Sequence, residues 1–508
     1  MYTFFTLLFT LFFTISGFSQ VSPDDFQLHH GSYTVGFKQY NTVDATRTYT
    51  RVFEWTQQKI QRPIPISMWY PSTTTNDKKT TILSYLEIFK NEREWESLPN
   101  EHLLNWFKYP TNTPHNVAML PKTTAAFANV PIADGKFPVV IYAPSYEASS
   151  IENFMLCEYL ASHGYIVISS PSRGATHQYF KGGTHEDMET QARDVEFLIQ
   201  EVLRVEQADH DKIATMGFSF GGMSNVLAQL RNAYIKAVVS LDGTIRYNYK
   251  VLKESPFHDI TKADVPFIHF AQKDIPAAVL KADNMDPKLN SQFEFYDRLL
   301  YSDAYTLKLH DLTHANFCSF GILFRPRDPR QDKSDEKILA SYKIVSTYTL
   351  HFLNAYLQNN QTALTFLQNT PEQNGIAKEL LSKEFKKATE KPMTFQRFND
   401  IAAKQSYQNM EALHKEIIQK HPNLELPEWK LNNLGLQLNF NPKTSHLGVL
   451  VFKFAIYLYP KSANLFDSLA EAYLYAGDHQ NAIIHFKKSL LLNPKNQNAR
   501  KRLKELEK

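Results

Sequence analysis

From Phe137 onward, short apolar runs alternate with stretches of helical periodicity, and this alternation restricts the fold more than any other feature of the chain. The runs show no polar face, which is typical of strands that are buried on both sides. Buried strands that alternate with helices form a parallel sheet covered on both faces, so we expect an α/β fold. The expected elements are a strand over 138–142, a helix over 151–162, a strand over 164–168, a helix over 186–205, a strand over 212–216, a helix after Gly221, and strands over 237–241, 266–270 and 305–309.

The sequence on either side of this core has a different texture. Residues 21–135 mix β-like stretches, such as Pro65 to Tyr70, with polar turns, which favours an antiparallel opening to the sheet. Beyond about Leu353 we expect no further strand, because polar, Lys- and Gln-rich helical sequence continues to the end. The expected division is a signal peptide over 1–19, the α/β domain over 20–355, a helical linker region over 356–428 and helical repeats over 429–508.

The repeat prediction rests on Ala463 to Pro494, which follows the spacing of a tetratricopeptide repeat. A degenerate copy of its second half precedes it by one period. Such helices cannot bury their apolar faces alone, so they stack on each other, on the α/β domain or on a protein partner. The positions that carry the pattern are Phe466, Leu469, Ala470, Tyr473, Ala482, Phe486, Ser489 and Pro494, preceded by Gly448, Phe452, Ala455 and Pro460.

The first residues indicate export. Phe4 to Ile15 is almost purely apolar, and the small residues Gly17 and Ser19 precede Gln20, where we expect cleavage. No Lys or Arg precedes the apolar run, which leaves a retained membrane anchor as the alternative. The run is shorter than the roughly 20 residues of a spanning helix, so cleavage is favoured. We therefore expect a periplasmic or secreted protein with no spanning segment after cleavage.

Charge and cysteine content argue against several classes of function. A net charge of +3 over 508 residues gives no sign of nucleic-acid binding. The two cysteines, Cys157 and Cys318, lie far apart and show no metal-ligand spacing. They are expected to be free, packed thiols, and neither a metal nor another cofactor is predicted.

The segment Gly217-Phe218-Ser219-Phe220-Gly221 has the pattern G-x-S-x-G between an expected strand and an expected helix. A nucleophilic serine at such a junction lies on a sharp turn that projects its hydroxyl above the sheet, and the glycines let strand and helix approach closely. The chain has only 17 glycines, so a chance match at this junction is improbable. Ser219 is therefore the predicted nucleophile.

A serine hydroxyl needs a base to remove its proton, and in this arrangement the base is a histidine further along the chain. His314 follows the last expected strand and begins a loop, which makes it the candidate. His269 and His310 fall within strand-like runs and are expected to be structural.

Two carboxylates are candidates for orienting the histidine. Asp242 directly follows the expected strand 237–241, and Asp274 follows the next strand. The carboxyl ends of parallel strands meet at one edge of the sheet, so both residues face the same site. Position alone leaves both assignments open.

A family resemblance bears on this choice. In the platelet-activating-factor acetylhydrolase branch of the α/β-hydrolases, which this chain resembles over roughly 135–350, the acid follows the strand after the nucleophile helix. The spacing of 23 residues in that family equals the separation of Ser219 and Asp242, so the resemblance favours Asp242. Dienelactone-hydrolase-like esterases share much of the pattern but carry the acid one strand later, which retains Asp274 as the alternative. The segments that carry the resemblance are 160–167, 217–222, 240–243 and 313–317.

The oxyanion of the reaction requires backbone N–H donors. The Phe220 amide, directly after the nucleophile, is the first candidate. The second is the Tyr146 amide, in the loop that follows the strand 138–142. The resembled family has a His-Gly turn there, whereas this chain has Pro144 and Ser145.

Together these residues predict hydrolysis of a small-molecule or lipid-like carboxylic ester through an acyl-enzyme, without a cofactor. A serine peptidase or amidase on the same three residues is one alternative. The other is a non-catalytic scaffold that acts through its repeats.

Overall fold

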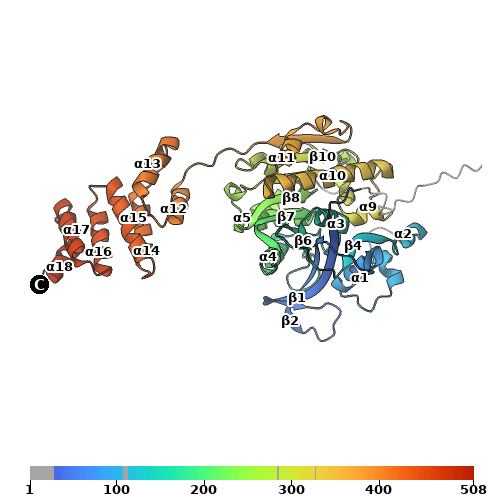
Figure 1. Cartoon of the computed structure of the whole chain (residues 1–508), viewed down its shortest axis with the longest axis horizontal. Coiled ribbons are helices and arrows are strands. Elements are labelled where there is room, and N and C mark those ends of the chain that lie inside the picture. The colour runs from blue at the N-terminus through green and yellow to red at the C-terminus, as the bar shows by residue number, and fades with distance from the viewer. Residues whose placement is uncertain (1–27, 107–111, 283–284, 326–327, 508) are drawn as a thin grey trace, which may run out of the picture. The chain divides into compact units, whose positions relative to one another are not determined.

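The computed structural model describes residues 28–106, 112–282, 285–325 and 328–507. The chain divides into two compact units, one ending at Thr389 and the other beginning at Glu390. Figure 1 shows the first unit in blue to light orange and the second in darker orange to red. The expected signal peptide over 1–19 lies outside the described residues.

The strands described in the first unit form one sheet of eleven, in the order β11-β10-β9-β8-β7-β5-β6-β2-β1-β4-β3. The neighbours from β6 to β10 in this order are all parallel, which confirms the predicted α/β class. The strands are β1 (Thr34–Thr50), β2 (Lys59–Ser72), β3 (Lys79–Thr81), β4 (Thr123–Ala128), β5 (Phe137–Ala143), β6 (Ile166–Ser169), β7 (Ala208–Phe218), β8 (Ile235–Leu241), β9 (Phe267–Ala271), β10 (Ala304–Leu309) and β11 (Leu381–Lys386).

Helices cover both faces of this sheet (Figure 1). Along β5, Val140 and Tyr142 belong to the core that contains α3 (Phe154–Ser162) and α10 (Asp335–Leu357). Val139 and Ile141 belong to the core that contains α4 (His185–Val202) and α5 (Phe220–Arg231). This alternation follows from the two-residue repeat of a strand, and it explains why the strand sequences lack a polar face. The helices of this unit are α1 (Ile82–Glu92), α2 (Pro114–Met119), α3 (Phe154–Ser162), α4 (His185–Val202), α5 (Phe220–Arg231), α6 (Tyr249–Lys253), α7 (Ala277–Ala282), α8 (Glu294–Arg298), α9 (Ser319–Leu323), α10 (Asp335–Leu357) and α11 (Gln361–Gln368).

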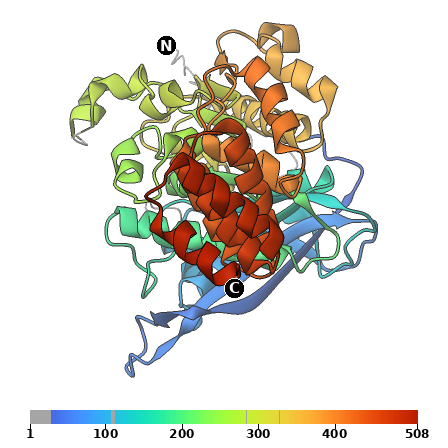
Figure 2. The same ribbon diagram turned by 90° about the vertical axis from the view of Figure 1, so that its left-hand side faces the viewer.

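The N-terminal strands form the predicted antiparallel opening. β1 and β2 pair antiparallel over most of their length and appear in Figure 2 as a long blue ribbon. β2 also pairs antiparallel with β6, which joins the ribbon to the parallel strands. β1 continues the sheet through a parallel pairing with β4.

The region over 356–428 differs from its expectation as one helical linker. α11 packs against α10, and β11 pairs antiparallel with β10, so the prediction that strands stop beyond about Leu353 is wrong. β11 has the sequence Leu-Ser-Lys-Glu-Phe-Lys, and only Leu381 is buried. At the edge of a sheet a strand can contribute backbone hydrogen bonds while its side chains stay polar, and such a strand lacks the apolar pattern of the central ones.

The second unit is a series of helices, α12 (Phe395–Lys404), α13 (Met410–Lys420), α14 (Glu428–Asn439), α15 (Ser445–Leu458), α16 (Ala463–Tyr475), α17 (His479–Leu492) and α18 (Gln497–Leu506). Helices α14 and α15 pack as one pair and α16 and α17 as another. The second pair covers the segment with the repeat spacing. Its side chains meet in a core that includes Leu469, Ala482 and Phe486. Across the described residues of both units, no helix is long and apolar enough to cross a membrane.

Candidate active site

Ser219 lies between the end of β7 and the first residue of α5, where the chain turns sharply. Its backbone φ of 52° and ψ of −117° are unfavourable for a residue with a side chain. Two hydrogen bonds hold the turn: the Ser219 amide donates to the Leu241 carbonyl at 3.1 Å, and its carbonyl accepts from the Thr244 amide at 2.8 Å. The turn is therefore stabilised by β8 and the loop after it.

The glycines around Ser219 are required by close backbone contacts. A Cβ atom at Gly221 would lie 2.1 Å from the Ala143 carbonyl oxygen, and one at Gly217 would lie 2.5 Å from the backbone of Gly221. Neither neighbour is a flexible side chain, so no larger residue fits at either position. The glycines thus bring the end of β5, which begins the predicted oxyanion loop, close to the serine turn.

The structure brings Ser219, His314 and Asp242 together, although they lie far apart in the sequence. His314 Nε2 is 3.0 Å from Ser219 Oγ, and His314 Nδ1 is 2.6 Å from Asp242 Oδ2. Asp242 directly follows β8, and His314 begins a short 3₁₀ helix (His314–Phe317) after β10. The order nucleophile, base and acid is the arrangement in which a histidine deprotonates a serine.

The carboxylate of Asp242 is fully buried. Burial by itself raises the pKa of Asp242, but hydrogen bonds with His314 and Tyr247 outweigh it and hold the pKa below its ordinary value. The side chain therefore stays ionised at neutral pH. An ionised carboxylate can fix the imidazole tautomer and stabilise the positive charge that forms when the imidazole takes a proton.

The alternative acid, Asp274, is not brought to the histidine. Its side chain is 64% exposed and forms an ion pair with Lys308. The other two candidate histidines form hydrogen bonds with serines other than Ser219. His269 is buried on β9 with its Nδ1 2.9 Å from Ser240 Oγ, and His310 Nε2 is 2.8 Å from Ser382 Oγ.

The sequence did not single out two residues that contact the triad of Ser219, His314 and Asp242. Tyr247 donates a hydrogen bond from its hydroxyl to Asp242 Oδ1 at 2.6 Å. The backbone N–H of Gln272 donates to the same oxygen at 3.1 Å. Gln272 directly follows β9, so its position at a strand end was the one available signal, whereas Tyr247 lies in a loop that has no recognisable pattern.

The loop after β5, which carries the second predicted oxyanion donor, is held from several sides. Gln191 donates to the Pro144 carbonyl at 2.8 Å, and the Ser145 amide donates to the buried Glu152 carboxylate at 2.9 Å. The Tyr146 ring contacts the Phe220 ring edge-on, with centroids 5.9 Å apart. The loop and the residue after the nucleophile are therefore adjacent. Ser145, which replaces the glycine of the resembled family, anchors the loop.

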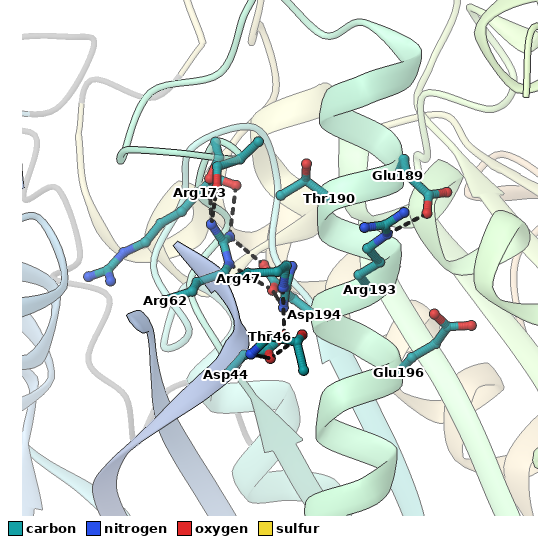
Figure 3. Close-up of polar contacts among 12 residues, drawn as sticks. Asp44, Thr46, Arg47, Arg62, Arg173, Glu189, Thr190, Arg193, Asp194 and Glu196 are labelled. Atoms are coloured by element: carbon teal, nitrogen blue, oxygen red, sulfur yellow. Dashed lines mark hydrogen bonds and ion pairs between the residues drawn. The ribbon is translucent and has the colours of Figure 1, made fainter. Parts of the chain in front are cut away.

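A network of buried charges fixes the neighbouring loop after β6 (Figure 3). Arg62 on β2 is 1% exposed and pairs with Asp194 on α4 at 2.7 Å, and it also donates to the carbonyls of Arg173 and Gly174. Arg47 on β1 binds the same Asp194 at 2.6 Å. The network ties together the β1–β2 ribbon, α4 and the loop, whose later residue Phe180 packs against Phe220.

An open groove of about 610 Å³ runs along this network, and none of the triad residues lines it. Arg47 is paired with Asp44 and Asp194. Glu189 is paired with Arg193 and Arg231. Pairing within the chain therefore neutralises much of the charge in the groove. Its walls are Thr46, Arg47, Thr48, Ala175, Thr176, His185, Glu186, Glu189, Thr190, Arg193, Ser255, Pro256 and Phe257.

Comparison with known proteins agrees with this arrangement. Residues 65–257 match the family model of the X-Pro dipeptidyl-peptidases (S15 family). The chain has the α/β-hydrolase fold. The match includes Ser219 and Asp242 and ends before His314, and with the fold it supports a hydrolase activity of the serine type.

The chain is similar to the solved structure of a ferulic acid esterase from Streptomyces cinnamoneus, with 17% sequence identity and a TM-score of 0.47. The similarity covers 70% of this chain and 97% of the esterase. No curated protein matches the chain.

Proposed function

We propose that this protein is an exported serine hydrolase that cleaves carboxylic esters through an acyl-enzyme on Ser219. The observation that carries the proposal is the continuous chain of hydrogen bonds from Ser219 Oγ through His314 to the buried Asp242. Ser219 lies on a strained turn at the carboxyl end of β7. In the α/β-hydrolase fold the nucleophile occupies this position.

In the first half of the reaction, Ser219 Oγ attacks the carbonyl carbon of the ester while His314 Nε2 takes the hydroxyl proton. The tetrahedral intermediate collapses, His314 returns the proton to the departing alcohol, and an acyl-enzyme remains. Asp242 holds the imidazole and stabilises its positive charge throughout. We assign the oxyanion to the backbone N–H groups of Phe220 and Tyr146.

In the second half, a water molecule replaces the alcohol. His314 removes one of its protons, the oxygen attacks the acyl carbon, and the proton returns to Ser219 Oγ as the carboxylic acid leaves. Every proton transfer uses the same imidazole nitrogen, so the 3.0 Å contact between His314 Nε2 and Ser219 Oγ is used in both halves.

A peptidase is the second candidate, because the S15 family model matches residues 65–257. The match stops before the histidine and Gln272, so it does not extend over the complete site. The resemblance to acetylhydrolases extends through the histidine segment 313–317 and favours an ester.

A substrate panel separates the two candidates. Activated short-chain esters and Xaa-Pro anilides are assayed with the wild-type protein and with Ser219→Ala as the blank. We expect hydrolysis of the esters with a kcat/KM at least about 100-fold above that for the anilides, the equivalent of about 2.7 kcal/mol. The reverse preference would make the protein a dipeptidyl-peptidase, and turnover of neither class would contradict the proposed function.

For the second unit, we propose that α14 to α17 are tetratricopeptide-type repeats that bind a protein partner. The support is the repeat spacing of the sequence together with the two packed helix pairs. Export likewise remains a proposal that rests on the first 19 residues. Cell fractionation followed by sequencing of the N-terminus tests it. A protein confined to the cytoplasmic fraction would contradict export, whereas an exported protein that retains Met1 would contradict only cleavage.

A further inference from the structure

Asp242 has hydrogen bonds on both of its carboxylate oxygens. Oδ2 faces His314, while Oδ1 accepts from the Tyr247 hydroxyl at 2.6 Å and from the backbone N–H of Gln272 at 3.1 Å. A carboxylate held at both oxygens cannot rotate about its terminal bond without losing a contact. The plane of the acid, and so the direction in which it holds the imidazole, is therefore set by residues outside the triad.

Gln272 contacts the base as well as the acid. Its side-chain Oε1 accepts a hydrogen bond from the backbone amide of His314 at 3.1 Å. Its side-chain Nε2 donates to the Tyr247 hydroxyl at 3.1 Å. One glutamine thus links the backbone that carries His314 to the tyrosine that holds Asp242.

This arrangement brings three segments together at one point: the loop after β8, the end of β9 and the loop after β10. Gln272 is buried, with 7% of its surface exposed. In a low-dielectric environment such bonds are strong, and an unpaired partner is costly. These hydrogen bonds therefore fix the imidazole of His314 in one orientation relative to the sheet.

We propose that Tyr247 and Gln272 are positioning residues, which form a clamp that holds the Asp242–His314 pair in the orientation required for proton transfer from Ser219. The inference rests on the proposed function and adds two residues to the site. The hydrogen bonds of Tyr247 and Gln272 at the site go to Asp242, to His314 and to each other, so both residues act through the acid and the base.

The clamp predicts a pH effect of definite sign. The Tyr247 hydroxyl withdraws charge from the Asp242 carboxylate, so its removal leaves more negative charge to stabilise protonated His314. Loss of the hydroxyl therefore moves the acidic limb of the kcat/KM profile to higher pH. The ionisable or charged groups that face this pair are Glu152, His269 and Arg246, and all of them remain in place in the variant.

The test uses the full chain and a matched pair of variants. Tyr247→Phe removes the hydroxyl that binds Asp242. Tyr249→Phe removes a hydroxyl two residues away that binds His258 at 2.7 Å and does not contact the triad. We expect Tyr247→Phe to lower kcat/KM for an activated ester by about 10- to 100-fold, with the acidic limb shifted upward. Tyr249→Phe should leave the rate and the limb unchanged.

A double-mutant cycle tests the link between the two residues. Gln272→Leu removes the acceptor of the His314 amide and the donor to Tyr247, so it should also lower kcat/KM about 10- to 100-fold. Combined with Tyr247→Phe, the loss should be smaller than the product of the single losses, because both variants disrupt one clamp. Thermal unfolding of all four proteins checks folding.

The rate of covalent labelling by a fluorophosphonate separates failure of this inference from failure of the proposed function. A wild-type protein that is labelled at Ser219, with Tyr247→Phe and Tyr249→Phe labelled equally fast and showing the same pH limb, would overturn the clamp alone. A wild-type protein that is not labelled would overturn the proposed function, and the clamp with it.

Discussion

The two units of the chain bury very different side chains. Among the described residues of the second unit, no acidic side chain, lysine, arginine or histidine is buried, and apart from two tyrosines the buried polar side chains are Asn439 and Ser489. The first unit buries ionisable groups, including Arg62, Asp194 and Asp242, in paired arrangements. Buried charges are costly unless they are paired, and at sites of chemistry they provide fixed polarity. The comparison agrees with the proposal that the first unit performs the reaction and that the second provides a binding surface.

The largest loss of activity is expected from Ser219→Ala in the first unit. Loss of the hydroxyl removes the atom that forms the acyl bond, so ester turnover should fall by a factor on the order of 10⁴ or more while the unfolding temperature stays unchanged. The control is Ser224→Ala, one turn further along α5, whose buried hydroxyl bonds to the Phe220 carbonyl. Comparable turnover in Ser219→Ala and Ser224→Ala would contradict the assignment.

The next effect concerns the acid. Asp242→Asn should lower kcat by up to about 10⁴ with the fold intact, because an amide can no longer fix the tautomer of His314 or stabilise its charge. Asp274→Asn, which disrupts an exposed ion pair, should change the rate less than about two-fold. Both are assayed on one activated ester, with circular dichroism as the folding control. A large loss at Asp274 would move the acid to the position used by dienelactone hydrolases.

Acid should weaken the first unit through His269. Burial lowers the pKa of His269 from 6.5 to about 3, so between these values the unfolded chain binds a proton that the folded chain does not. The free energy of unfolding should therefore fall with decreasing pH below about 6.5, by up to about 1.4 kcal/mol per pH unit from this group.

His269→Asn should reduce that slope, and the control variant His310→Asn, at a partly exposed position, should not. Denaturant unfolding between pH 7 and 4.5 measures the difference. Equal slopes in the wild-type protein and in His269→Asn would show that the imidazole is charged in the folded state.

The smallest effect is expected from removing the second unit. A chain that ends at Thr389 keeps β11 on the sheet and should hydrolyse the ester within about two-fold of the full chain, because the triad is complete by His314. Ending at Leu380 removes β11 and exposes the edge of β10, so this variant should aggregate. Size-exclusion chromatography and kcat/KM measure both. A folded, inactive chain ending at Thr389 would show that the helices help to form the site.

The same contrast explains what the sequence reveals. The central strands and Ser219 were predictable because their signals are local: an apolar run, or a serine between two glycines at a strand end. His314 and Asp242 were selected by position at strand ends and by family resemblance, and the structure brings both to Ser219. The catalytic roles of all three remain predictions.

Other features depend on long-range contacts that no local pattern encodes. β11 is polar and gains its stability from pairing with β10. Tyr247 has no composition or spacing that distinguishes it from other loop residues, and Gln272 is marked only by its position after β9. Their contacts with the acid and the base become visible only when three strand ends meet. The same holds for the limit of the second unit, which begins at Glu390 and so includes α12, where Phe398 stacks against Phe454 on α15.

Whether Ser219 is the nucleophile is tested most directly by covalent labelling with a fluorophosphonate, read by intact mass and by mapping of the modified peptide. We expect one adduct per chain, located on Ser219, absent in Ser219→Ala and greatly slowed in His314→Ala but unaffected in His310→Ala. An unmodified wild-type protein, or an adduct on another serine, would contradict it.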